Sequence, residues 1–129
     1  MDTTFIIGLL RGDPATVEKA RQLDTEGGAA STVVNVFEIA YGVHRSMSGS
    51  ERRREQAHKV VSNLEIFPLN TRAAYEAAKI AADLDKRGMT VDPFDALVAG
   101  IALTNGVKTI VTRKADHFER IPGIEVENH

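Results

Sequence analysis

Hydrophobic residues recur three or four positions apart in six stretches of the chain, a spacing that places them on one face of a helix. Asp13-Pro14 and Asp92-Pro93 each supply an N-cap followed by a proline in the first helical turn. The pattern predicts helices between Asp2 and Gly12, from Asp13 to the glycines at 27–28, from about Asn35 to Arg45, from Ser50 to Leu64, from about Thr71 to Lys86, and from Asp92 to Leu103.

Short β-branched or apolar runs separate these helices, at 29–34, 65–69, 109–112 and 125–127. The third run has the composition of a buried parallel strand, and Pro68 favours an edge position for the second. Strands that alternate with helices predict a parallel sheet covered on both faces. We therefore expect one α/β domain over residues 1–129, with a three-layer α/β/α architecture and ligands at the carboxyl ends of the strands.

The last two long helices have distinctive faces. In the helix at about 71–86, one face is expected to carry Ala74, Ala77, Ala78, Ala81 and Leu84. These small residues would let another helix approach closely, within the chain or across a dimer. The helix after Asp92 has an apolar stripe of Phe94, Leu97, Val98, Ile101 and Ala102. Asp95 falls at the edge of that stripe, which predicts a carboxylate beside the core unless Asp92 and Asp95 only start the helix.

Composition narrows the class of protein. The 129 residues include no cysteine, which excludes disulfides and thiolate metal sites. A formal net charge of −2 argues against holding nucleic acid through a broad positive field, although it permits metal ions at a local acidic site. No apolar run reaches the ~18 residues of a membrane span, and the N-terminus lacks the basic flank of a signal peptide. We expect a cytoplasmic protein without a membrane partner.

Four acids stand at helix starts or just after predicted strands: Asp2, Glu38, Asp95 and Asp116. A parallel α/β sheet gathers such positions at one edge. Carboxylates within about 6 Å would repel by roughly 2 to 3 kcal/mol per pair at an effective dielectric of 20, so a cluster requires a cation or a raised pKa. Oxygen ligands favour Mg²⁺ or Mn²⁺, whose bound water can attack a phosphodiester. The pattern predicts a nuclease, unless Asn35 and Glu38 merely form a capping box.

Four segments, in order, resemble the motifs of PIN-domain ribonucleases, particularly toxins of the VapC type. They are DTTFIIGLLRG at 2–12, NVFEIAYGV at 35–43, DPFDALVA at 92–99 and IVTRKADHFERIPG at 110–123. No single segment is specific, but the four together span essentially the whole chain. The resemblance implies a Mg²⁺-dependent endoribonuclease, with Mn²⁺ able to substitute, that cuts tRNA, rRNA or mRNA. It also implies a homodimer that a cognate antitoxin protein holds inactive.

The resemblance assigns roles to the acids. Asp2, Glu38 and Asp95 correspond to the first three catalytic and metal-binding acids of the family. Asp95 is preferred to Asp92 because the family's acid directly precedes the small apolar helix segment. Asp116 is expected to complete the set, although Asp92 could do so, or the site could use three acids.

The chain departs from the family's pattern in two places. Many relatives have asparagine or aspartate two residues after the threonine, where this chain has Lys114, which makes the assignment of Asp116 less direct. Thr112 itself either orients a ligand or simply ends a strand. Relatives also have several apolar residues before the first aspartate, whereas only Met1 precedes Asp2. The central strand is therefore expected to be curtailed, or the natural start to lie upstream.

Other functions remain open at this point. A non-catalytic module that kept the fold could bind RNA or a protein partner. An aspartyl-phosphate phosphatase is suggested by the early Asp-x-Thr, but that chemistry usually needs a second aspartate where Thr4 stands. His44, His58 and His117 are expected at surface or structural positions, because metal-bound water needs no histidine nearby. For an antitoxin, we hypothesise a hydrophobic groove beside the helix from Asp13 to Thr25, with a partner arginine entering the acidic pocket.

Overall fold

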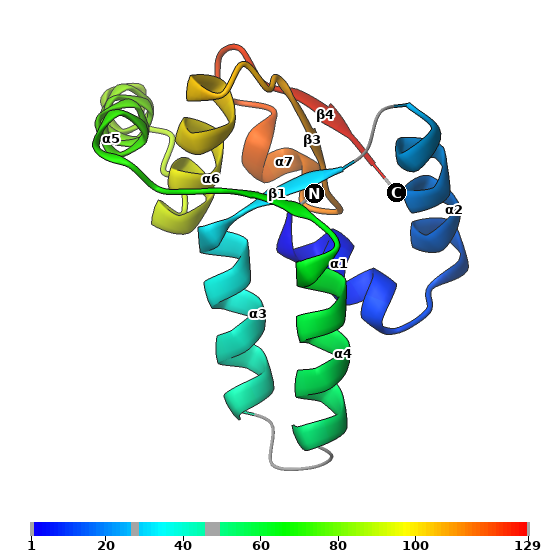
Figure 1. Ribbon diagram of the computed structural model, residues 1–129. Helices are drawn as coiled ribbons and strands as arrows, with labels where there is room; N and C mark the ends of the chain where they lie inside the picture. Colours follow the sequence, from blue (N-terminus) through cyan, green and yellow to red (C-terminus); the bar gives the residue numbers. More distant parts are fainter. Residues whose placement is uncertain (1, 27–28, 46–49, 129) are drawn as a thin grey trace.

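The computed structural model describes residues 2–26, 29–45 and 50–128, so the predicted helix stop at 27–28 lies outside the described residues. The elements follow the predicted order (Figure 1). The helices are α1 (Thr3–Leu10), α2 (Pro14–Thr25), α3 (Val33–Arg45), α4 (Ser50–Ser62), α5 (Thr71–Lys86), α6 (Pro93–Thr104) and α7 (Ala115–Phe118). The strands are β1 (Ala30–Thr32), β2 (Glu65–Phe67), β3 (Thr109–Val111) and β4 (Glu125–Glu127).

The strands pair in parallel, as the alternation of helices and strands predicted. β1 pairs with β2 in the register Ala30↔Glu65, and β3 pairs with β4 in the register Thr109↔Glu125. Within the described ranges the strands form two separate two-stranded ladders, and a cavity of about 40 Å³ is lined by both ladders and by α6. Helices α5 and α6 lie together on one side of the strands and α2 on the other (Figure 1). The α/β fold class with helices on both sides is confirmed.

Helices α5 and α6 pack closely because small residues meet where they cross. Gly100 of α6 is buried, and a Cβ atom there would lie 2.8 Å from the carbonyl oxygen of Ala73 and 2.8 Å from the amide nitrogen of Ala77. The side of α5 that carries these alanines therefore serves packing within the chain. The main hydrophobic core forms around this crossing and includes Val98, Ile101, Ile110 and Phe118.

The prediction for the buried face of α5 is right in part: Ala77 and Leu84 are buried and Ala81 is half-buried. The buried residues of the helix are Ala73, Ala77, Ile80 and Leu84. Ala74 and Ala78, which we had placed on the inner face, are exposed. Alanine is tolerated on either face of a helix, whereas the larger Ile80 gains more from burial and decides the rotation. Although α5 has 16 residues, none of the helices described is both long enough and apolar enough to cross a membrane.

Helices α3 and α4 form a pair that extends away from the strands (Figure 1). Ile39 of α3 and Ala57 of α4 are buried with Ile6 of α1 in a second apolar cluster. Helix α1 contacts α2, α3 and α4, and the amide of Asp2 just before it donates to the carbonyl of Val111 in β3 (3.4 Å). The start of α1 therefore lies where the α3–α4 pair meets the strands.

Two local expectations are wrong in ways that affect the site. Helix α3 begins at Val33 rather than Asn35, because the Thr32 hydroxyl accepts the backbone N–H of Asn35 (3.2 Å) and caps the helix earlier. Since Asn35 lies inside the helix, it does not form a capping box with Glu38. Phe94, expected in the buried stripe of α6, is 42% exposed, because its ring packs against Phe37 of α3 rather than into the core.

Candidate functional site

Asp2 lies just before α1 and its carboxylate is fixed on both oxygens. Oδ1 accepts the backbone N–H of Phe5 (3.1 Å) and the hydroxyl of Thr4 (2.7 Å), so the side chain caps α1. Oδ2 accepts the hydroxyl of Thr112, which follows β3 (2.5 Å). Asp2 is only 2% exposed. Thr112, which the sequence left as a ligand-orienting or a strand-ending residue, orients Asp2.

Glu38 projects from α3 toward the start of α1. The hydroxyl of Thr3 donates to Glu38 Oε1 (2.8 Å), and the side-chain amide of Asn35 donates to that hydroxyl (3.0 Å). Asn35 is buried, and its Oδ1 accepts the hydroxyls of Ser31 (3.1 Å) and Thr32 (2.9 Å). This chain of hydrogen bonds ties the second acid to β1 and to the helix that Asp2 caps. Sequence reasoning missed the role of Asn35.

Asp95 stands in the first turn of α6 and is 3% exposed. Its Oδ1 lies 3.3 Å from Nζ of Lys114, and its Oδ2 lies 3.0 Å from Nδ1 of His117. The neighbouring Asp92 performs the capping, because its side chain accepts the backbone N–H of Phe94 (2.8 Å). Asp95 therefore does more than start the helix: it is a buried acid paired with basic groups that follow β3.

The charges of these groups act on one another. Burial raises the pKa of Glu38 above its ordinary value of 4.5, and the charge of Asp95 adds to that effect. The hydrogen bond from Thr3 and the charge of Lys114 lower the pKa of Glu38 in part. Burial lowers the pKa of Lys114, but attraction to Asp95, Asp2 and Glu38 outweighs it and leaves the pKa above 10.5. The three carboxylates thus share one electrostatic pocket with the Lys114 ammonium.

The fourth predicted acid, Asp116, is not brought into this pocket. It is exposed on α7 and lines, with Asp92, His117 and Arg120, a cavity of about 240 Å³. The next residue, His117, is the one that contacts Asp95. Successive helical side chains point about 100° apart, so both cannot face the same acid. Lys114 interacts electrostatically with Asp2, Glu38 and Asp95, and a ligand role for each of the four predicted acids stays a prediction.

The donors match a hard divalent cation in chemistry, since carboxylate oxygens are the ligands that Mg²⁺ takes. Their arrangement differs from a ready-made metal site. Across residues 2–26, 29–45 and 50–128, no three carboxylate or imidazole groups are grouped so that they could hold one ion. Both oxygens of Asp2 accept hydrogen bonds, and both oxygens of Asp95 lie against Lys114 and His117. A metal held by Asp2, Glu38 and Asp95 would have to replace part of these contacts.

The two basic groups beside Asp95 were not predicted. For Lys114 the sequence did carry a signal, because the residue stands two positions after Thr112, where the resemblance implied asparagine or aspartate. If that position holds an oxygen ligand in the family, it should face the acids whatever residue fills it. His117 offered no comparable signal. The four-residue helix α7 was not predicted, so the direction of its side chains could not be assigned.

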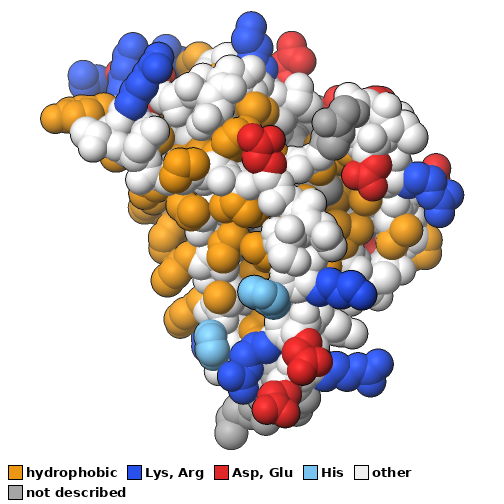
Figure 2. Space-filling view, viewed as in Figure 1, with side chains coloured by type: hydrophobic (Ala, Val, Ile, Leu, Met, Phe, Trp, Pro, Cys, Tyr) orange, Lys and Arg blue, Asp and Glu red, His pale blue; other side chains and the backbone are white. Residues whose placement is uncertain are grey.

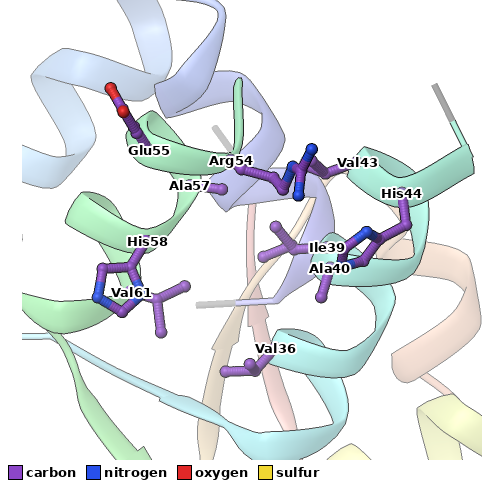
Figure 3. Close-up of a pocket in the computed structure, with 10 residues that line it drawn as sticks. All are labelled: Val36, Ile39, Ala40, Val43, His44, Arg54, Glu55, Ala57, His58 and Val61. Atoms are coloured by element: carbon purple, nitrogen blue, oxygen red, sulfur yellow. The ribbon is translucent and has the colours of Figure 1, made fainter. Parts of the chain in front are cut away.

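Two hollows flank α3. One, of about 360 Å³, is lined by residues of α1, α3 and α4, among them Ile7, Glu38 and Val43. The other, of about 450 Å³, lies between α3 and α4, where Val36 and Ala40 face Val61 (Figure 3). Figure 2 shows hydrophobic side chains gathered over this helix pair. The hollow that reaches an acid therefore lies on α1, α3 and α4, whereas the sequence-based hypothesis placed a groove beside α2.

Comparisons with known proteins extend over nearly the whole chain. A family model described as the PIN domain matches residues 1–124. The chain is 31% identical to the tRNA(fMet)-specific endonuclease VapC of Salmonella typhimurium, with 99% of this chain and 95% of the relative covered. It is 32% identical to Ribonuclease VapC1 of Rickettsia felis, with 98% and 92% covered. The crystal structure of DNA-bound VapBC from Salmonella typhimurium matches with a TM-score of 0.87 at 31% identity, covering 98% and 94% of the two chains.

Proposed function

The chain belongs to the PIN domain family, and we propose that it is a metal-dependent endoribonuclease that serves as the toxin of a type II toxin–antitoxin pair. The observation that carries the proposal is that Asp2, Glu38 and Asp95, from three distant parts of the sequence, all interact with Lys114, while Thr3 beside Asp2 donates a hydrogen bond to Glu38. Relatives of about this length named ribonuclease or endonuclease support the same chemistry.

In the proposed reaction, Asp2, Glu38 and Asp95 would hold Mg²⁺, and the metal would supply an activated water and stabilise charge on the phosphodiester. Helices α1, α3 and α6 each present one acid, and the hydrogen bonds to Asp2 and Glu38 keep their carboxylates in place. A carboxylate of the pocket would accept the proton of the attacking water. The water oxygen bonds to phosphorus, the bond from phosphorus to O3′ breaks, and O3′ takes a proton. The products are a 5′-phosphate and a 3′-hydroxyl.

Metal removal tests this proposal. We expect the purified protein to cut RNA in millimolar Mg²⁺ or Mn²⁺ and to lose at least about a hundred-fold in rate with excess EDTA, because the metal supplies several kcal/mol of transition-state stabilisation. Denaturing gels give the rate, and sequencing of the 5′ ends identifies the RNA and the bond. RNA cleavage at the same rate in excess EDTA as in Mg²⁺ would contradict metal dependence.

One observation favours a second candidate, a non-catalytic PIN-fold module that binds RNA or a partner. Lys114 and His117 lie against the two oxygens of Asp95, where a catalytic metal would compete with them. This alternative predicts intact RNA after incubation in millimolar Mg²⁺, while a gel-shift assay still detects an RNA complex. The cleavage assay above separates the two functions.

For the partner, we favour a cognate antitoxin that binds the hollow on α1, α3 and α4. That hollow is lined by the apolar Ile7, Leu10 and Val43, by Glu38, and by the basic Arg11 and Arg53, so it joins an apolar surface to charges of both signs. An inserted segment with apolar side chains and charges of both signs would match it. The groove hypothesised beside α2 stays an untested alternative.

The protein is also proposed to be a homodimer that pairs through exposed aromatic rings. Phe37 and Tyr41 are each 54% exposed and Phe94 is 42% exposed. The ring centroid of Phe37 lies 6.0 Å from that of Tyr41 and 5.8 Å from that of Phe94. Clustered aromatic side chains are enriched at protein interfaces and are costly to leave in water.

Light scattering on a sizing column tests both assembly proposals. We expect the protein alone to have twice the 14.0 kDa mass of one chain, and Phe37→Lys to return it to one chain by placing a charge among the aromatic rings. Tyr75→Lys, on the exposed side of α5, is the matched control and should stay dimeric. Co-expression with the adjacent reading frame should give a heavier complex that no longer cuts RNA. A wild-type protein of single-chain mass would rule out the dimer.

A further inference from the structure

The acidic pocket contains a cation that belongs to the chain itself. Nζ of Lys114 lies 3.3 Å from Oδ1 of Asp95. The backbone N–H of Lys114 donates to the hydroxyl of Thr112 (2.9 Å), which in turn donates to Asp2 (2.5 Å). The Lys114 backbone is therefore fixed by the same hydrogen bonds that orient the first acid, and its side chain pairs with the third.

We propose that Lys114 is a built-in counter-cation of the acidic pocket, which competes with a divalent metal for Asp95 and so weakens metal binding. The inference rests on the proposed function, in which this pocket is the metal site. An ammonium group and a divalent ion cannot both lie against one carboxylate without strong repulsion, because both are positive. Metal can bind fully only when the ammonium leaves Oδ1 of Asp95.

The ammonium group of Lys114 can move away from Asp95 easily. The Lys114 side chain is 32% exposed, whereas that of Asp95 is 5% exposed, so the ammonium lies between the buried acid and solvent. Lysine carries its charge on a flexible four-carbon stem and makes no bidentate contact, so it can turn outward without disturbing the backbone. The His117 side chain, which is 44% exposed, lies against the other oxygen of Asp95. A substitution of Lys114 alone leaves that residue unchanged.

Calorimetric titration of the full chain with Mn²⁺ tests the competition. We expect Lys114→Met, which keeps the length of the side chain without its charge, and Lys114→Asn to bind Mn²⁺ at least about ten-fold more tightly than the wild type. Lys108→Met is the matched control, since Lys108 is exposed just before β3, and it should bind like the wild type. Equal dissociation constants for the wild type and both Lys114 variants, or saturable binding in none of them, would overturn the inference.

A wild-type measurement keeps the test independent of folding in the variants. Lys114 should react slowly with an amine-acylating reagent in metal-free buffer and several-fold faster in saturating Mn²⁺, as read by mass spectrometry of its peptide, because metal frees the ammonium. A Lys114 reactivity that Mn²⁺ does not raise would also overturn the inference. The proposed function fails separately: tighter binding by the variants with no RNA cleavage by any protein would sustain the competition and remove the nuclease.

Discussion

Asp95→Asn is expected to lower the rate of RNA cleavage by about a thousand-fold, which corresponds to about 4 kcal/mol of lost transition-state stabilisation. The variant removes one negative charge from the centre of the pocket and leaves a poorer metal ligand in its place. Asparagine can keep an oxygen toward Lys114, so the local hydrogen bonding and the fold should survive. A single-turnover assay in Mg²⁺ measures the rate, and circular dichroism checks the fold.

The matched control lies three residues away. Asp92 caps the same helix but is exposed, and asparagine caps a helix as well as aspartate does. Asp92→Asn should therefore keep the activity that Asp95→Asn loses, and Asp2→Asn, which changes another acid of the pocket, should lose it as well. If purified, folded Asp2→Asn and Asp95→Asn both cut RNA at the wild-type rate, the nuclease does not act through this pocket. Asp116→Asn measures whether the exposed acid of α7 contributes.

The places of Asp2 and Asp95 could be predicted from the sequence because local rules set them. Asp2 caps the helix that follows it, and Asp95 occupies the first turn of a helix whose cap and proline are unambiguous. Parallel strand order then gathers such positions at one edge of the strands. The contacts of Lys114 and His117 depend instead on the path of a short irregular segment after β3. No hydrophobic periodicity constrains that path. The sequence therefore suggested Asp116 as the residue beside the other acids, whereas in the structure its neighbour His117 contacts Asp95.

The fold shows the same division between local and tertiary causes. The order of elements and most helix starts follow from caps and spacing, which are properties of neighbouring residues. The buried face of α5 does not, because alanines on both sides of the helix leave its rotation open until Gly100 of α6 packs against Ala73 and Ala77. Likewise, Phe94 fits an apolar stripe by spacing alone, but its exposure depends on its tertiary neighbour, because the ring packs against Phe37 of α3 rather than into the core.

Gly100→Ala is expected to destabilise the protein by about 2 to 3 kcal/mol, although alanine is the better helix former. The new methyl group would lie 2.8 Å from backbone atoms of Ala73 and Ala77, a separation that real side chains essentially never show. Because those atoms belong to the α5 backbone, no side-chain rotation can relieve the overlap. The two helices must move apart at the centre of the main core. Urea unfolding followed by circular dichroism measures the change.

Gly42→Ala is the matched control, since it makes the same substitution inside α3 with nothing within 4 Å of the new Cβ atom. It should stabilise the protein by up to about 1 kcal/mol through helix propensity alone. The opposite signs of the two changes would separate packing at the α5–α6 crossing from the intrinsic cost of glycine. A Gly100→Ala variant as stable as Gly42→Ala would mean that α5 and α6 do not cross as closely as described. The orientation of Asp95, which α6 carries into the pocket, would then lose its support.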